Sequence, residues 1–262
     1  MNIASDTMKI FDESEEYQDR IVTFIDVMGV KNKIKHSKKP SDFRMYATIL
    51  NSYAHQPFAE GKLNITMFSD CMYIVSETQH LDQLICLLAN FAYTMLMNRL
   101  PTITVNEDGS FTSKIDWDCF KLRGGITYGK VFVLDHAAKN AGIHLNTNIV
   151  LGPAPLMAYE LESSKAVYPR IIADDCFISL IENLNKKPED YYFTKDRDDN
   201  CYYIDFLNYM CSGNQKNTKV FELLDGCIEY VKQELDTALG NGNERLTKQL
   251  LWYIHHLESY VN

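Results

Sequence analysis

The sequence predicts an α+β fold with one main domain. Short runs of β-branched and aromatic residues, each bounded by glycine or polar turn residues, predict strands in the N-terminal half. Longer segments with an apolar residue at every third or fourth position predict helices, and 46% hydrophobic residues in a chain of 262 allow one substantial core. We expect the main domain over 19–210, after a polar leader at 1–18 and before a helical extension at 211–262.

The first predicted strand carries a carboxylate at its end. β-branched and aromatic residues fill the run from Ile21 to Ile25, and Gly29 stops the strand. Asp26 therefore lies at the mouth of a buried strand.

A second carboxylate is predicted on a neighbouring strand end, because residues 63–68 and 71–75 indicate two strands joined by a tight turn at Ser69 and Asp70. Two bare carboxylates about 4 Å apart repel each other by roughly 1 to 4 kcal/mol over the plausible range of effective dielectric constants, so such a pair requires a proton or a cation. Magnesium suits the pattern, since it is commonly held by one or two carboxylates together with substrate phosphates. The alternative is that both aspartates only cap turns.

The remaining elements follow from periodicity, capping and turn signals. A helix at 81–100 has an apolar stripe that is expected to pack across the sheet. The sequence GNGN at 240–243 divides the tail into two amphipathic helices, which predicts a helical hairpin used for core or dimer packing. Residues 101–117 indicate an irregular excursion or a small hairpin. The other expected elements are a helix at 41–53, a strand, a glycine-containing bend and a second strand over 119–135, a helix at 156–163, and strands at 168–173 and 202–206.

Two segments carry positive charge that could bind a phosphate. Arg123 lies within an apolar strand, where an arginine is rarely buried without a partner and where its planar guanidinium suits a phosphate. A salt bridge at the strand edge is the alternative. The basic run at 31–39 predicts either a solvated loop or a positive rim that attracts a polyphosphate, and both interpretations can hold together.

Composition excludes several classes of partner. A formal net charge of -9 disfavours binding to nucleic acid. No apolar run is long enough to span a membrane, and the polar, acidic N-terminal stretch resembles neither a signal peptide nor an anchor. Seven cysteines without metal-ligand spacing indicate reduced thiols in the core and a cytoplasmic protein.

Four segments, in this order, resemble the class III nucleotidyl cyclase catalytic domain. FIDVMG at 24–29 resembles the family's F-x-D-x-x-G metal strand, and SDCMYIVSE at 69–77 resembles its G-D-x-x-x-x-V-S-G hairpin. LRGGITYGKVF at 122–132 is similar to the M-R-x-G-I-x-x-G-x-V strand pair. LGPAPLMAYELES at 151–163 stands where the G-x-x-V-N-x-A-x-R-M-E-S helix would be.

The resemblance implies a ferredoxin-like βαββαβ core that works as a head-to-tail homodimer, with the substrate at the interface. It implies that Asp26 and Asp70 bind two Mg²⁺ or Mn²⁺ ions, in a metal site that also includes the flanking residues Ile25 and Val27. In that chemistry the ribose 3′-hydroxyl attacks the α-phosphate, and a 3′,5′-cyclic nucleotide and pyrophosphate form.

The resemblance also assigns residues to the nucleotide. The turn through Gly29, Val30 and Lys31 matches the segment that cradles the triphosphate, and Arg123 matches a triphosphate-binding arginine.

Departures from the family pattern bear on specificity and catalysis. The lysine and aspartate that read adenine fall near Thr66 and Ile149, so neither purine-reading group is present. The asparagine that orients the ribose falls at Leu156, and the transition-state arginine falls at Glu160.

The segment AYELESSKAVYPRI at 158–171 is similar to that of the bacterial Pycsar pyrimidine cyclases. This resemblance implies cyclisation of UTP, which we favour, or of CTP, with a product that acts on a separate effector protein during phage infection. Tyr159, Lys165 and Arg170 become candidates for the missing interface contacts; the alternatives are a core tyrosine and two surface bases. A nucleotide-binding regulatory domain without chemistry and a purine cyclase with different base contacts remain as alternative functions.

Overall fold

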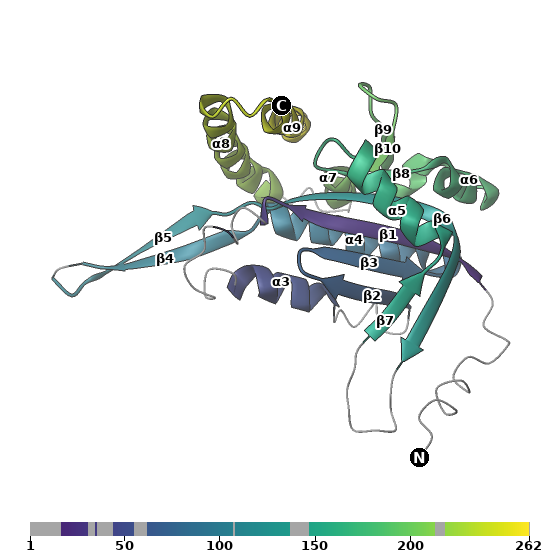
Figure 1. Cartoon of the computed structure of the whole chain (residues 1–262). Coiled ribbons are helices and arrows are strands. Elements are labelled where there is room, and N and C mark those ends of the chain that lie inside the picture. Colours follow the sequence, from purple (N-terminus) through teal and green to yellow (C-terminus); the bar gives the residue numbers. More distant parts are fainter. Residues whose placement is uncertain are drawn as a thin grey trace, which may run out of the picture.

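The computed structural model describes residues 17–30, 35, 44–54, 62–106, 108–136, 147–212 and 218–261. Its architecture is α+β: an eight-stranded sheet has the order β2-β3-β1-β6-β8-β10-β9, with β7 paired to β6 (Figure 1). The strands of this sheet are β1 (Gln18–Met28), β2 (Leu63–Phe68), β3 (Cys71–Ser76), β6 (Lys121–His136), β7 (Thr147–Leu151), β8 (Ile171–Ala173), β9 (Phe193–Lys195) and β10 (Tyr202–Ile204).

Helices cover this sheet and extend the chain beyond it. Helices α4, α5 and α6 contact the central strands. The helices are α3 (Arg44–Ala54), α4 (Leu81–Leu96), α5 (Pro153–Glu160), α6 (Asp175–Asn183), α7 (Phe206–Ser212), α8 (Thr218–Gly240) and α9 (Glu244–Glu258), with single turns at η2 (Thr78–His80), η3 (Leu161–Lys165) and η4 (Pro188–Tyr191).

The predicted ferredoxin-like βαββαβ core is confirmed by the strand order and directions. Strand β1 lies between β3 and β6, β3 pairs with β2, and all three of these pairings are antiparallel. Helix α3 follows β1 and α4 follows the β2–β3 hairpin, which completes the βαββαβ sequence of elements. Strand β8 then extends the sheet by pairing parallel to β6.

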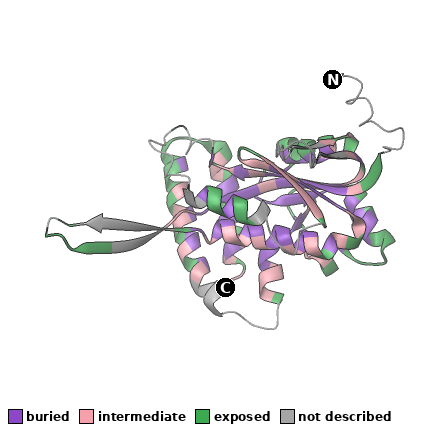
Figure 2. Cartoon of the chain, turned by 90° about the horizontal axis from the view of Figure 1, so that it is seen from below, coloured by how far each residue is buried: buried purple, intermediate pink, exposed green. Residues whose placement is uncertain are grey.

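The two faces of β1 face two separate apolar layers. Ile21 and Ile25 belong to the main core, which contains most of α4, whereas Val22 and Phe24 pack in a smaller cluster with alanines of α5. This alternation is what a strand buried on both faces requires. Asp26 follows Phe24 at the next position on the α5 side, so the strand directs its carboxylate away from the main core. Figure 2 shows the buried residues concentrated in the body of the molecule.

The predicted C-terminal helical hairpin is confirmed. Helices α8 and α9 contact each other and are joined by a turn at 241–243. Helix α9 is fastened to the domain by two hydrogen bonds: Gln249 Nε2 donates to the Val167 carbonyl at 2.7 Å, and Trp252 Nε1 donates to Asp196 Oδ2 at 2.8 Å.

Several predicted boundaries differ from the structure. The segment 119–135 contains one continuous strand, β6, without the expected bend, because its glycines lie inside the ladder with β1. The helix expected over 81–100 ends at Leu96, because the chain continues from Arg99 as β4 (Arg99–Val105), which forms a hairpin with β5 (Phe111–Trp117). This hairpin extends away from the body of the molecule (Figure 1).

Further differences lie at element ends. Strand β8 begins at Ile171 rather than at 168, and β10 ends at Ile204. Helix α5 ends at Glu160 and continues as the π-helical turn η3 instead of ending at 163. Among the described residues, no helix has both the length and the apolar character needed to cross a membrane.

Gly125 of β6 allows α5 and η3 to approach the sheet closely. A Cβ atom at this position would lie 2.4 Å from the Ala158 carbonyl oxygen and 2.5 Å from Leu161 Cβ. Gly125→Ala is therefore expected to lower the free energy of unfolding by about 1–3 kcal/mol through overpacking.

Gly129→Ala is the matched control on the same strand. Among the described residues, a Cβ there would meet only Ala154 Cβ, at 3.5 Å, which is ordinary contact. We expect this change to be neutral or to stabilise by less than about 1 kcal/mol. Urea denaturation of both variants measures the difference, and equal stabilities would contradict the close approach.

Candidate functional site

The two predicted carboxylates lie together beside a thiol. Asp26 of β1 is opposite Cys71 of β3 in the ladder, and Asp70 occupies the preceding turn, where Ser69 adopts a φ of 56°. The Val27 N–H donates to the Asp70 carbonyl at 3.1 Å and fixes the turn against β1. One ligand atom from each of Asp26, Asp70 and Cys71 lies within 4.8 Å of the others, and all three residues are half-buried.

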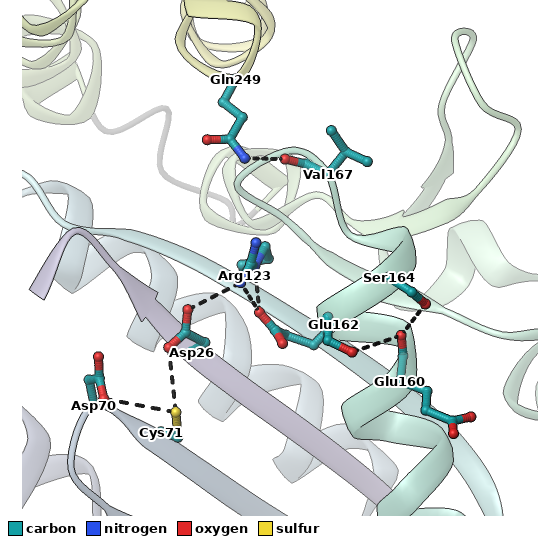
Figure 3. A network of polar contacts seen from close by, with 10 residues as sticks. Asp26, Asp70, Cys71, Arg123, Glu160, Glu162, Ser164, Val167 and Gln249 are labelled. Atoms are coloured by element: carbon teal, nitrogen blue, oxygen red, sulfur yellow. Dashed lines mark hydrogen bonds and ion pairs between the residues drawn. The ribbon is translucent and has the colours of Figure 1, made fainter. Parts of the chain in front are cut away.

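The local environment disfavours charge on Asp26 in the absence of a cation. Burial is the largest cause of its raised pKa, and the Asp70 carboxylate adds to it; the Cys71 hydrogen bond and the Arg123 charge oppose the shift. Burial and the two carboxylates also raise the pKa of the Cys71 thiol to about 12. The thiol is therefore protonated and donates to Asp26 Oδ1 at 3.4 Å (Figure 3).

Arg123 lies on the other side of Asp26 and joins it to a third carboxylate. It is opposite Asp26 in the β1–β6 ladder, with its Nη2 3.5 Å from Asp26 Oδ2. Its Nε donates to Glu162 Oε1 at 2.5 Å, and a second guanidinium nitrogen also contacts this oxygen (Figure 3). Glu162 belongs to η3 and is only 4% exposed, and burial is the main reason why its pKa is raised.

The charge of this cluster is suited to a divalent cation. Asp26, Asp70 and Glu162 can supply three negative charges and Arg123 supplies one positive charge, which leaves a formal deficit of two positive charges. The Asp26 and Asp70 oxygens are hard ligands of the kind that Mg²⁺ and Mn²⁺ take. The residues present therefore fit the divalent cations implied by the resemblance.

The residues that flank Asp26 in the sequence were also predicted to take part in metal or triphosphate binding. Gly29 forms the exposed turn after β1, with a φ of 87° that favours glycine, and the side chains of Val30, Ile25 and Val27 are buried in the main core. Those apolar side chains carry no metal ligand, so only their backbone groups could take part. Lys31 lies outside the described residues.

Two other residues predicted to contact the nucleotide lie apart from the carboxylate pair. Tyr159 is exposed on α5, and its ring contacts Phe24 at 5.4 Å between centroids. Lys165 is exposed at the end of η3, where its charge acts on Asp174. Neither contacts the carboxylate pair in this structure.

Arg170 is buried and already paired. Its guanidinium forms ion pairs with Asp196 and Asp199 and lies over the ring of Trp252, at 5.3 Å from the centroid. Its positive charge is therefore neutralised by ion pairs within the fold, and nucleotide binding by Arg170 stays a prediction.

Two residues of this site, Cys71 and Glu162, were not predicted from the sequence. Cys71 was interpreted as a small core residue, although its position next to Asp70 could have indicated a ligand. Glu162 pairs with Arg123 across 39 positions of sequence, and no local pattern predicts that contact.

Comparisons with known proteins give structural neighbours only. No protein-family profile and no curated protein matches the chain. The monomeric guanylyl cyclase domain of the RhoGC fusion protein from the aquatic fungus Blastocladiella emersonii has a TM-score of 0.49 at 14% identity, covering 72% of this chain and 96% of that one.

Two other solved structures are similar at comparable levels. The guanylate cyclase domain of RhGC from Catenaria anguillulae in complex with GTP has a TM-score of 0.47 at 14% identity, covering 72% and 96% of the two chains. The adenylyl cyclase CyaB from P. aeruginosa has a TM-score of 0.41 at 16% identity, covering 64% and 84%. TM-scores below 0.5 at such identity do not establish a shared activity.

Removing the Arg123 charge should destabilise the protein in a pH-dependent manner. Arg123→Met leaves Asp26 and Glu162 without their cation, which is expected to cost about 3 kcal/mol near neutral pH. The pKa values of both carboxyl groups are raised, so the folded state favours their neutral forms. The stability lost in Arg123→Met is therefore expected to decrease as pH falls and both groups become protonated. Urea denaturation at about pH 5 and about pH 8 measures this trend.

Lys130→Met is the matched control, because Lys130 forms an exposed ion pair with Asp19 on the same two strands. We expect it to cost less than about 1 kcal/mol. A cost for Arg123→Met that is equal to this control, or that grows toward low pH, would contradict the assigned cluster.

Proposed function

We propose that this chain is a class III nucleotidyl cyclase that converts a pyrimidine nucleoside triphosphate, UTP in preference to CTP, into its 3′,5′-cyclic monophosphate and pyrophosphate. The observation that carries the proposal is the juxtaposition of Asp26 and Asp70 at adjacent strand ends, with Arg123 beside Asp26. The residues come from separate segments of sequence, and each matches a position of the family motifs quoted above.

In this proposal Asp26 and Asp70 hold the divalent cations. When bound, Mg²⁺ or Mn²⁺ ions would neutralise the triphosphate and stabilise the attacking and leaving oxygens of an in-line displacement. Arg123 limits repulsion between the carboxylates before the substrate arrives and is available to a phosphate oxygen through its partly exposed side chain, which is 17% accessible. Glu162 fixes the guanidinium from the buried side.

The exposed turn at Gly29 supports a role in binding the triphosphate. Its left-handed backbone lies two positions after Val27, immediately beyond the strand that carries Asp26. Backbone N–H groups in such turns are common ligands of phosphate oxygens. Val30 and Lys31 continue this segment in the proposal.

Pyrimidine specificity rests on the absence of the purine-reading pair. Thr66 of β2 replaces a long lysine, and its buried hydroxyl has no hydrogen-bond partner among the described residues. A hydroxyl can both donate and accept, so it suits uracil or cytosine alike. The preference for UTP, and the action of the product on a separate effector in anti-phage defence, rest on the Pycsar resemblance.

Exposed apolar side chains support a homodimer with the active site at its interface. Phe68 is 50% exposed and Tyr159 is 47% exposed, and both rings contact Phe24. Leu156 is 56% exposed one helical turn before Tyr159, beside the exposed Glu160. A second copy covering this patch would bring its own groups to the positions where the ribose-orienting asparagine and the transition-state arginine are missing.

The reaction is tested by incubating the purified full chain with ATP, GTP, CTP or UTP in the presence of Mn²⁺ and identifying products by mass. A single cyclic pyrimidine nucleotide is the expected result. A cyclic purine would replace the pyrimidine assignment, whereas nucleotide binding without release of pyrophosphate would favour the regulatory domain.

Asp26→Asn and Asp70→Asn should each lower turnover by more than about 100-fold, because even a partner that only supports a metal ligand typically contributes 10- to 100-fold. Asp26→Asn should also leave the metal-free protein at least as stable as the parent, since it removes a charge that the fold disfavours. Product formation and thermal unfolding are measured on the same samples.

Asp19→Asn is the control for these variants, since Asp19 is an exposed carboxylate on the same strand. It should retain turnover. Unchanged activity in Asp26→Asn, with a confirmed fold, would contradict the assignment of Asp26 as a metal ligand.

A further inference from the structure

The segment 161–170 includes η3, leads into β8, and contacts β6 near both of its ends. Near its start, Glu162 forms the ion pair with Arg123. At its end, the Arg170 carbonyl accepts a hydrogen bond from the Gly124 N–H at 3.1 Å, and Gly124 directly follows Arg123 on β6. The placement of this segment therefore determines how Glu162 meets the guanidinium.

Helix α9 packs on the middle of the same segment. Gln249 Nε2 donates to the Val167 carbonyl at 2.7 Å, and the ring of Trp252 stacks on Tyr168 with 5.2 Å between centroids and an interplanar angle of 12°. Figure 3 shows Gln249 reaching from α9 to the loop that follows η3. The C-terminal hairpin thus contacts the segment between its two connections to β6.

Gln249 is a polar residue on the buried face of its helix. It is 5% exposed, and the other buried residues of α9 are the largely apolar Leu250, Tyr253, Ile254 and Leu257. Burial of an amide costs free energy unless the amide is hydrogen-bonded, and an apolar side chain of similar size would fill the same space without that cost. Gln249 therefore contributes a directed hydrogen bond rather than apolar packing.

The turn that this hydrogen bond restrains has an unusual geometry. The π-helical conformation of η3 is rare in proteins and occurs frequently at functional sites. The Val167 N–H donates to the Lys165 carbonyl at 2.8 Å, so Val167 is tied to the last residue of the turn. A bond from Gln249 to Val167 therefore restrains the turn that directs Glu162.

The other helix of the hairpin is attached to β6 itself. Glu234 of α8 forms an ion pair with Lys121, whose side chain is 7% exposed. Lys121 lies two positions before Arg123 on the strand, and residues two apart on a strand share a face. The hairpin therefore holds both the strand that carries Arg123 and the segment that carries Glu162.

We propose that Gln249 is a positioning residue for the candidate active site. Its hydrogen bond to Val167 holds the segment that directs Glu162 to Arg123, and the hairpin thereby sets the orientation in which the guanidinium receives a phosphate oxygen. This inference rests on the proposed function for its effect on the substrate alone, because the orientation of Arg123 is measurable without turnover.

The first test follows the Arg123 Nε–H signal by nitrogen NMR of the full chain, assigned by its absence in Arg123→Met. Gln249→Met removes the hydrogen-bond donor and keeps a side chain of similar size. Hydrogen exchange of the Arg123 Nε–H should become about 3- to 10-fold faster, the effect of losing one hydrogen bond. Unchanged exchange in folded Gln249→Met overturns the proposal.

Lys232→Met is the matched control, because Lys232 joins α8 to α9 through a solvent-accessible ion pair with Glu258 at 3.2 Å. It should keep the parent rate of exchange at the Arg123 Nε–H and the parent turnover. Equal acceleration of exchange in Lys232→Met and Gln249→Met would mean a general loosening of the hairpin and would overturn the specific role of Gln249.

A double-mutant cycle tests whether Gln249 acts through Glu162. In an active enzyme, Gln249→Met should raise the KM for the nucleoside triphosphate by about 3- to 10-fold, and this increase should disappear in a Glu162→Gln background. An increase that is equal in both backgrounds overturns the route through Glu162. If the chain has no turnover but the Arg123 signal responds to Gln249→Met, the proposed function fails and the positioning role stands.

The parent chain provides the test if Gln249→Met fails to fold. Hydrogen exchange is measured in increasing urea below the global unfolding transition, where local openings are resolved. Undocking of α9 should release the 161–170 segment, so the Arg123 Nε–H should lose protection at no higher urea concentration than the α9 amides. Protection of Arg123 that outlasts that of α9 overturns the proposal.

Discussion

Strand β1 pairs with β3 on one side and β6 on the other, and its register determines the composition of the candidate site. That register sets Asp26 opposite Cys71 on β3 and opposite Arg123 on β6, so a thiol and a guanidinium flank the same carboxylate. A slip by one residue would turn Asp26 toward the main core and remove both neighbours. The apolar alternation that drives β1 into the middle of the sheet therefore also assembles the charged cluster at its end.

The order of the core could be predicted from sequence because its signals are local. β-branched runs, the Gly29 stop and the Ser69–Asp70 turn determine strands and hairpin within a few residues of each other. The continuous course of β6 could not be predicted, because a glycine pair is typical of a bend unless a neighbouring segment fills the space. Here α5 and η3 fill it: the Ala158 carbonyl would lie 2.4 Å from a Cβ at Gly125. This constraint comes from tertiary packing.

The difference between local signals and tertiary packing also explains which residues of the site could be predicted. Asp26 lies two residues before the end of β1 and Asp70 lies in the turn before β3, so their proximity follows from the pairing of β1 with β3. Glu162 was missed because its role depends on the π-helical turn η3, which directs a buried carboxylate toward Arg123. Arg170 had the chemistry of a phosphate ligand, but only the structure shows its ion pairs with Asp196 and Asp199.

The proposed function requires Asp26 and Asp70 to hold a divalent cation together near the end of β1. Manganese binding to the full chain in the absence of nucleotide can be counted by electron paramagnetic resonance. We expect a manganese site in the parent protein that is lost in both Asp26→Asn and Asp70→Asn and kept in Asp19→Asn. Manganese binding that is unchanged in either of the first two variants, with the fold retained, would contradict it.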